Sequence, residues 1–120
     1  MELLEQHCHH RGPEERLDET EARDLLARLD THWSVVEGGA AIEAHVELAD
    51  FRELMLFLQA LAWISHTEDH HPEVRFVYRD CHIRYSTHSA GGLTLNDFIC
   101  AARVDALLRQ YRETRPAPAQ

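Results

Sequence analysis

The chain has 120 residues, of which 44% are hydrophobic, a size that fits one folded domain and excludes a two-domain enzyme with a separate nucleotide-binding fold. Twenty-one acidic residues stand against twelve basic ones, all arginine, which gives a formal net charge of -9. Nucleic acids and anionic membrane surfaces attract cationic proteins, so this charge argues against both as partners. The chain also carries ten histidines, whose side chains titrate near neutral pH.

The cysteines and the N-terminus indicate where the protein works. Cys8, Cys81 and Cys100 include no C-x-x-C pair and match neither a disulfide framework nor a zinc ribbon. We predict a reducing compartment, with Cys81 and Cys100 as small core residues. Residues 1–12 lack the basic and apolar regions of a signal peptide. The longest apolar stretch, residues 54–64, is too short to span a bilayer, so we expect a soluble cytoplasmic protein.

The first part of the chain predicts a tail, a helix and a hairpin. Residues 1–15 are polar and rich in histidine, and we expect a loose tail there. Asp18 and Glu21 have the spacing of a capping box, which begins a helix. Residues 33–48 include alternating apolar and polar side chains and a Gly-Gly pair, which predicts a β-hairpin.

A long helix is predicted from Phe51 to about Thr67, begun by Asp50 and Glu53, which have the spacing of a capping box. Two apolar stripes run along it at helical spacing, whereas a surface helix of a monomer needs only one. The first consists of Phe51, Leu54, Met55, Leu58, Leu61 and Ala62, and the second of Leu56, Phe57, Ala60, Trp63 and Ile64. We expect the second stripe to be buried against another subunit.

The second half predicts another hairpin and a last helix. Residues 74–78 and 83–87 alternate as strands do. Thr94 and Asp97 form a further capping box, from which a helix runs to about Arg112. The chain therefore contains two helix–hairpin units and a final helix.

The order α-β-β-α-β-β-α predicts an α+β domain, with three helices packed on one face of a four-stranded antiparallel sheet. We expect this domain to cover residues 16–112. Residues 113–120, with two prolines, are expected to form a disordered tail.

Histidines gather around the end of the long helix. His66 and His70 are one helical turn apart, and His71 follows directly. His88 ends the last strand, and Asp97 lies in the first turn of the last helix. Because strand ends and helix termini can meet at one edge of a sheet, we expect these groups to share one cleft.

Three interpretations of these residues compete. Histidines near a helix C-terminus complement its dipole and Asp97 caps a helix, which would make them structural. A His-x-x-x-His pair can ligate zinc, but zincin metalloproteases need Glu after the first His, where Thr67 stands. The segment His7-Cys8-His9-His10 is a weak metal candidate and more typical of a solvated tail. We predict no functional metal. The third interpretation is acid–base chemistry by several imidazoles.

The combined pattern resembles the pterin-4a-carbinolamine dehydratase family. The family motif has an acidic residue or His, then His-His-Pro, an aromatic residue, a further His and a later Asp at fixed spacings. The matching positions are His66, His70, His71, Pro72, Tyr78, His88 and Asp97. The similarity covers roughly residues 17–110. His66 and Val74 stand where the family usually has Glu and Trp, so substrate preference and rate should differ more than the reaction.

The resemblance implies dehydration of a 4a-hydroxytetrahydropterin to the quinonoid dihydropterin and water, which recycles a tetrahydrobiopterin-type cofactor. The substrate is a small pterin, and the reaction needs no metal or bound cofactor. By similarity, His70 and His88 form the acid–base pair, His71 orients the pterin, and Asp97 accepts a hydrogen bond. The residues expected to bind substrate are His66, Asp69, Pro72, Tyr78, Thr87 and Trp33.

Other functions stay open. Some relatives serve as dimerisation cofactors of a transcription factor or look like RuBisCO assembly helpers, so a non-catalytic partner-binding role is the main alternative. The resemblance also implies a homodimer or homotetramer through the helix of residues 51–64. A small His-rich metal-binding protein is a further possibility. The intact motif favours the enzyme, because a purely structural descendant has no need for four polar groups at one edge.

Overall fold

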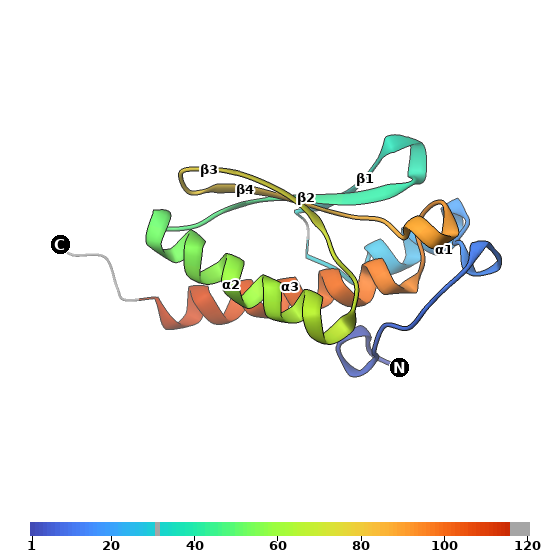
Figure 1. Ribbon diagram of the computed structural model, residues 1–120, viewed down its shortest axis with the longest axis horizontal. Helices are drawn as coiled ribbons and strands as arrows, with labels where there is room; N and C mark the ends of the chain where they lie inside the picture. Colours follow the sequence, from blue (N-terminus) through green and yellow to red (C-terminus); the bar gives the residue numbers. More distant parts are fainter. Residues whose placement is uncertain (31, 116–120) are drawn as a thin grey trace.

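The computed structural model describes residues 1–30 and 32–115 and shows a sheet with helices packed on one face (Figure 1). The helices are α1 (Glu19–Leu26), α2 (Phe51–Glu68) and α3 (Leu95–Thr114). The strands are β1 (Trp33–Val36), β2 (Ala41–Glu47), β3 (Glu73–Val77) and β4 (Asp80–Tyr85). All strand pairs are antiparallel, in the order β1-β2-β4-β3. The predicted α+β class and element order are confirmed.

The two central strands separate an apolar face from a polar one. Ala44 of β2 pairs with Ile83 of β4, and Val46 pairs with Cys81. The inward side chains are at most 3% exposed: Ile42, Ala44, Val46, Cys81, Ile83 and Tyr85. The intervening positions carry Glu43, His45, Glu47, His82 and Arg84. Because successive strand residues point to opposite faces, the helices cover the apolar face and leave the charged face outside.

Capping residues fix where α1 and α3 begin. Asp18 Oδ1 accepts a hydrogen bond from Glu21 N at 2.8 Å, and the Glu21 side chain accepts one from Asp18 N at 3.0 Å. Thr94 and Asp97 form the same reciprocal arrangement at α3. Each box satisfies amide groups that have no partner inside the helix. The predicted capping boxes of α1 and α3 are therefore confirmed, and Asp97 lies in the first turn of α3. At α2 only half of the predicted box forms, because Asp50 accepts from Glu53 N while the Glu53 side chain accepts from Ala49 N.

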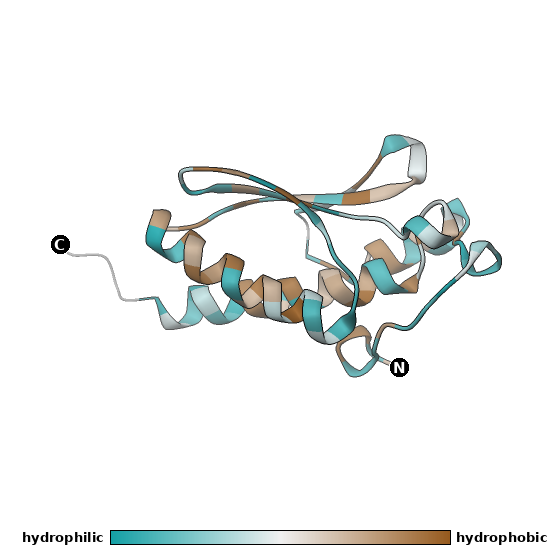
Figure 2. Ribbon diagram, viewed as in Figure 1, coloured by the Kyte–Doolittle hydropathy of each residue, from teal (hydrophilic) through white to brown (hydrophobic). Residues whose placement is uncertain are grey.

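The α2 helix turns one apolar face fully inward. Leu54, Phe57 and Leu61, which share a face by helical spacing, are at most 2% exposed. The assignment of Phe57 to an outward stripe was therefore wrong. Leu56 and Trp63 of that stripe are 52% and 66% exposed. Figure 2 shows that hydrophobic residues nevertheless extend along much of α2.

Residues 1–11, called the N-terminal arm below, pack against the ends of α2 and α3. Leu3 is 4% exposed and belongs to the main core. Cys8 N donates to Glu68 Oε1 at 2.8 Å, and Asn96 Nδ2 donates to His9 O at 2.7 Å. The expectation of a loose tail is thereby corrected, because polar side chains of two helices satisfy the backbone of the arm.

The last helix ends at Thr114, two residues beyond the predicted end. Residues 116–120 of the predicted C-terminal tail lie outside the described residues. Among the described helices, none is long and apolar enough to cross a membrane.

A buried carboxylate joins α3 to the segment that enters β1. Asp105 is 2% exposed, and its Oδ1 accepts a hydrogen bond from Trp33 Nε1 at 2.6 Å. Its Oδ2 accepts one from Asp30 N at 2.9 Å. His32 Nε2 lies 2.8 Å from Oδ1. A buried carboxylate needs such donors, so these hydrogen bonds fix the start of β1 against α3.

We expect Asp105→Ala to lower the free energy of unfolding by about 2–4 kcal/mol, because Trp33 Nε1 and Asp30 N lose their acceptor inside the protein. Urea unfolding followed by circular dichroism measures the change. Asp24→Ala, at an exposed position of α1, is the matched control and should stay within about 0.5 kcal/mol of the parent. Equal stabilities of the two variants would contradict this role of Asp105.

Candidate active site

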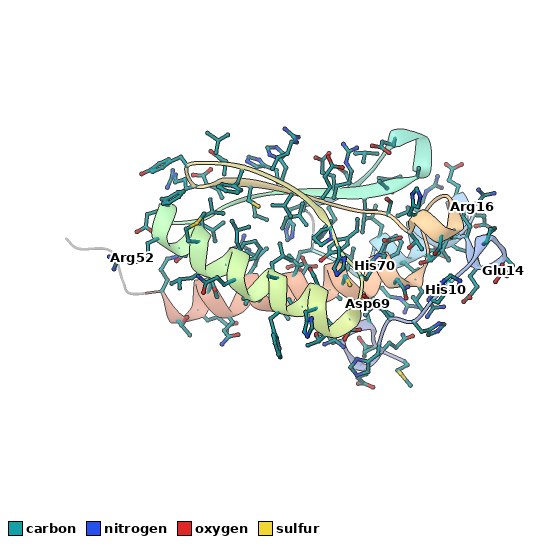
Figure 3. The ribbon with its side chains drawn as sticks, viewed as in Figure 1. His10, Glu14, Arg16, Arg52, Asp69 and His70 are labelled. Carbon is teal, nitrogen blue, oxygen red and sulfur yellow. The ribbon has the colours of Figure 1, made fainter. Side chains whose placement is uncertain are left out.

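His70 and Asp97 meet in the interior although they are far apart in the chain. Asp69, the C-cap of α2, adopts a left-handed conformation with φ of 50°, which turns the chain out of the helix. His70 Nε2 then lies 2.7 Å from Asp97 Oδ1. Asp97 is fully buried, and the His70 side chain is 12% exposed. Figure 3 shows His70 between the sheet and α3. This contact occupies Nε2, so Nδ1 is the ring nitrogen of His70 that remains for another partner.

The other oxygen of Asp97 is held by the end of β4 and the cap of α3. Thr87 Oγ1 donates to Oδ2 at 2.9 Å, and Thr94 N donates to the same oxygen at 3.0 Å. The two threonine hydroxyls are 2.7 Å apart. These donors fix the carboxylate plane and leave Oδ1 for His70. The structure thus places three predicted site residues, His70, Thr87 and Asp97, in one network.

Tyr85 sets the plane of the His70 ring. The two rings are stacked, with centroids 5.8 Å apart and planes at 9°. Tyr85 is fully buried, and its hydroxyl has no hydrogen-bond partner among the described residues. Burial raises the pKa of Tyr85 well above its usual value, so the hydroxyl stays protonated. The sequence analysis missed this residue, although its inward position at the end of β4 was a signal.

A hollow of about 380 Å³ opens beside the end of α2. His66, His71, Pro72 and Val74 line one part of it. The rest of the lining is Leu58, Leu61, Ala62 and Ser65. An apolar floor with a few polar groups suits a small planar ligand. His70 is not among the lining residues, so the predicted cleft shared by all the histidines is present only in part.

His88 lies next to the Asp97 network in the chain. It begins the short 3-10 helix η4 (His88–Ala90), directly after Thr87, and its side chain is exposed. Asp69 is also exposed, at the C-cap of α2. Neither side chain has a hydrogen bond within the described residues that joins it to His70.

Two predicted binding residues lie elsewhere in this chain. Tyr78 is at the turn between β3 and β4, 65% exposed and with φ of 55°. The whole of β3, about 17 Å of extended chain, separates it from Pro72. Trp33 is 4% exposed and packs on Tyr85 with ring centroids 6.1 Å apart. Trp33 is therefore a core residue here, and a single chain does not bring Tyr78 to His70.

A larger hollow of about 700 Å³ contains none of the predicted site residues. It lies between α1 and the β1–β2 turn. Its charged lining combines Arg16 and Arg23 with Asp18 and Glu19. Because the two positive and two negative side chains balance, this hollow favours neither an anionic nor a cationic ligand. We therefore place the candidate active site at the histidines.

The N-terminal arm contacts a direct or near neighbour of His70, Asp97 and His88. Its contacts reach Glu68, two residues before His70, and Asn96, which precedes Asp97. Ser89 Oγ, next to His88, donates to the carbonyl of Arg11 at 2.7 Å. The arm therefore braces the three segments that carry the site. Sequence reasoning missed this brace, since contacts between backbone and polar side chains leave no periodic pattern.

Glu68 is the main anchor of the arm. Burial acts to raise its pKa, but the hydrogen bonds from Cys8 N and His7 and the charge of Arg103 outweigh this effect. The pKa of Glu68 therefore lies below its ordinary value of 4.5. A carboxyl group whose pKa is lowered by folding stabilises the folded state above its ordinary pKa. That contribution is lost as the pH falls through the lowered value.

We expect Glu68→Gln to reduce the stability difference between pH 7 and pH 3, because the ionised form of Glu68 is the one that folding favours. The free energy of unfolding in urea at both pH values measures this difference. Glu113→Gln, at an exposed position of α3, is the control and should keep the difference of the parent. An unchanged difference in Glu68→Gln would contradict the assignment.

Comparison with known proteins identifies the family of this chain. The sequence pattern of the family Pterin 4 alpha carbinolamine dehydratase matches residues 15–107. Two relatives that carry the family name come from Legionella pneumophila (strain Lens) and Xanthomonas campestris pv. campestris (strain 8004). They are 40% and 45% identical over 108 and 109 residues, covering 89% and 90% of this chain and 96% and 92% of the relatives.

A solved structure from Brucella melitensis, described as a transcriptional coactivator/pterin dehydratase, has the same fold. It superposes with a TM-score of 0.73 at 33% identity and covers 77% of this chain and 97% of its own. The chain therefore belongs to the pterin-4-alpha-carbinolamine dehydratase family, as its histidine motif predicted.

Proposed function

We propose that this protein dehydrates a 4a-hydroxytetrahydropterin to the quinonoid dihydropterin and water, and so returns a tetrahydrobiopterin-type cofactor to use. The observation that carries the proposal is the buried hydrogen bond of 2.7 Å between His70 and Asp97, while the next residue, His71, lines a hollow together with His66. Membership of the dehydratase family supports the same reaction.

The reaction requires two proton transfers. A general acid protonates the hydroxyl on C4a, which leaves as water when the C–O bond breaks, and a general base removes the proton of ring nitrogen N5. Imidazoles suit both roles at neutral pH, and each transfer contributes about 10²–10⁴-fold. With Nε2 donating to Asp97, His70 offers Nδ1 as the base for N5. His88, exposed beside Thr87, is the acid for the hydroxyl.

The hollow beside α2 would hold one part of the pterin, and the ring edge with N5 and C4a would have to extend out of the hollow to His70, which does not line it. Leu58 and Leu61 supply an apolar floor for the flat ring system, and His71 and His66 supply polar edges. Asp69 at the C-cap places a carboxylate next to the histidines in the chain. Val74 lines the same hollow, and its small side chain leaves the ring less tightly enclosed than a tryptophan would.

We expect His70→Ala and His88→Ala each to lower kcat by about 10²–10⁴-fold, because each removes one proton-transfer group. A spectroscopic assay of quinonoid dihydropterin formation measures the rate. His82→Ala, on the outer face of the sheet, is the matched control and should keep the parental rate. Parental rates in both His70 and His88 variants would refute the acid–base assignment.

A partner-binding role is the second candidate function. The Brucella melitensis structure is described as a coactivator as well as a dehydratase. A non-catalytic transcription cofactor or RuBisCO assembly helper would use an exposed apolar surface rather than the Asp97 network. Such a protein would form no dihydropterin at all, so the assay above separates the two functions.

We also propose that Leu56 and Trp63 contact a second copy of this chain, giving a homodimer or homotetramer through α2. Both side chains are more than half exposed although they are large and apolar. Burial of such surface is favourable by roughly 25 cal/mol per Å² of apolar area. A contact between copies would bury this surface, which would account for the second apolar stripe on α2.

Trp63→Glu should lower the solution mass, because it places a charge in the contact between copies. Light scattering coupled to size exclusion measures the mass, and the parent should have two or four chains. Leu4→Glu, at an exposed apolar position of the N-terminal arm, serves as the control and should leave the mass unchanged. A monomeric parent, or a Trp63→Glu protein of parental mass, would rule out this interface.

A further inference from the structure

Two thiols meet where the N-terminal arm crosses α3. Cys8 Sγ and Cys100 Sγ are 3.6 Å apart, although 92 positions separate the two residues. Cys8 Sγ also lies 3.6 Å from the carbonyl oxygen of Asn96. Cys8 is half-buried and Cys100 fully buried, and neither is in a disulfide. The proposed reaction uses neither group.

The arm is fixed on both sides of Cys8. His7 Nδ1 lies 2.9 Å from Glu68 Oε2, and Cys8 N donates to the other oxygen of Glu68. On the other side, His9 O accepts a hydrogen bond from Asn96 Nδ2. The two sulfur atoms therefore stay near each other. A disulfide has a sulfur–sulfur distance of about 2.05 Å, so the sulfurs need to approach by about 1.5 Å.

We propose that Cys8 and Cys100 form a reversible disulfide when the protein meets a hydroperoxide, and that this bond locks the N-terminal arm onto α3. The inference does not depend on the dehydratase reaction.

The chemistry balances with one hydroperoxide molecule. The thiolate of Cys8 attacks the peroxide oxygen, the O–O bond breaks, an alcohol leaves, and Cys8 becomes a sulfenic acid. The sulfur of Cys100 loses its proton and attacks the sulfur of Cys8, and water leaves as the disulfide forms. The two thiols lose two electrons, which reduce the peroxide. A thiol reductant reverses the bond by exchange.

The surroundings favour this order of steps. Cys8 is the more exposed thiol and reacts first. The pKa of Cys100 is raised far above its usual range, chiefly by its contact with Cys8, then by burial and by the charge of a Cys8 thiolate. The raised pKa keeps Cys100 protonated in the reduced protein, so Cys100 is not the thiol that attacks the peroxide. Burial raises the pKa of Cys81 to about 11, and this thiol should stay reduced.

The disulfide would restrict the motion of the segments that carry His70, His88 and Asp97. The arm already contacts Glu68, Asn96 and Ser89, each within two residues of His70, Asp97 or His88. A covalent link would hold this brace closed and restrict the unfolded chain over a loop of about 90 residues. Oxidation should therefore raise the melting temperature of the protein.

The experiment treats the full chain with a few equivalents of tert-butyl hydroperoxide and then alkylates the remaining thiols under denaturing conditions. The reduced protein has three free thiols, and the oxidised protein should have one, at Cys81. Peptide mapping should find the peptides of Cys8 and Cys100 joined within one chain. The melting temperature should rise by about 5 °C or more, and dithiothreitol should reverse both changes.

Matched serine variants locate the bond. Cys8→Ser removes the more exposed thiol and should abolish both the link and the shift in melting temperature, while Cys81→Ser should retain both. Three alkylated thiols after treatment, an oxidised Cys8 without a link, or a bond to Cys81 or to a second chain would overturn the proposal. A Cys8–Cys100 bond without a rise in melting temperature would overturn the proposal that the bond fixes the N-terminal arm on α3.

Discussion

The buried carboxylate of Asp97 is the interaction on which the fold and the site both depend. It caps α3 through Thr94, holds the end of β4 through Thr87, and receives His70 from the end of α2. A carboxylate that is fully buried is tolerated only where donors surround it. The fold meets this requirement with groups from the end of α2, the end of β4 and the start of α3, and in doing so fixes their relative positions.

This sharing resolves a choice that the sequence left open. Asp97 was interpreted either as a helix cap or as part of an acid–base site, and the structure shows that one carboxylate does the first and has the contact needed for the second. Oδ2 accepts the hydrogen bonds from Thr94 N and Thr87, while Oδ1 faces His70. Stability and chemistry therefore use different atoms of one group.

Local patterns carried most of the prediction of the fold. Capping boxes at Asp18 and Thr94 and the alternation in the strands fix helix starts and sheet faces within a few residues, so these were predictable. The orientation of α2 was not, because apolar side chains surround most of that helix and its rotation is set by contacts with the sheet and α3. Phe57 was misplaced for that reason. The contacts of the N-terminal arm were not predictable either, because they are polar and join residues far apart in the chain.

The site divides into a rigid part and an open part, and the departures from the usual family residues fall in only one of them. His70, Thr87 and Asp97 form the rigid network, where the proposed proton transfer demands fixed geometry. His66 and Val74 line the open hollow, where a ring system needs only shape and a few polar contacts. Changes in the hollow alter how firmly a ligand is held without moving a proton donor or acceptor. The two positions that depart from the motif therefore line the hollow, whereas the contact between His70 and Asp97 involves neither of them.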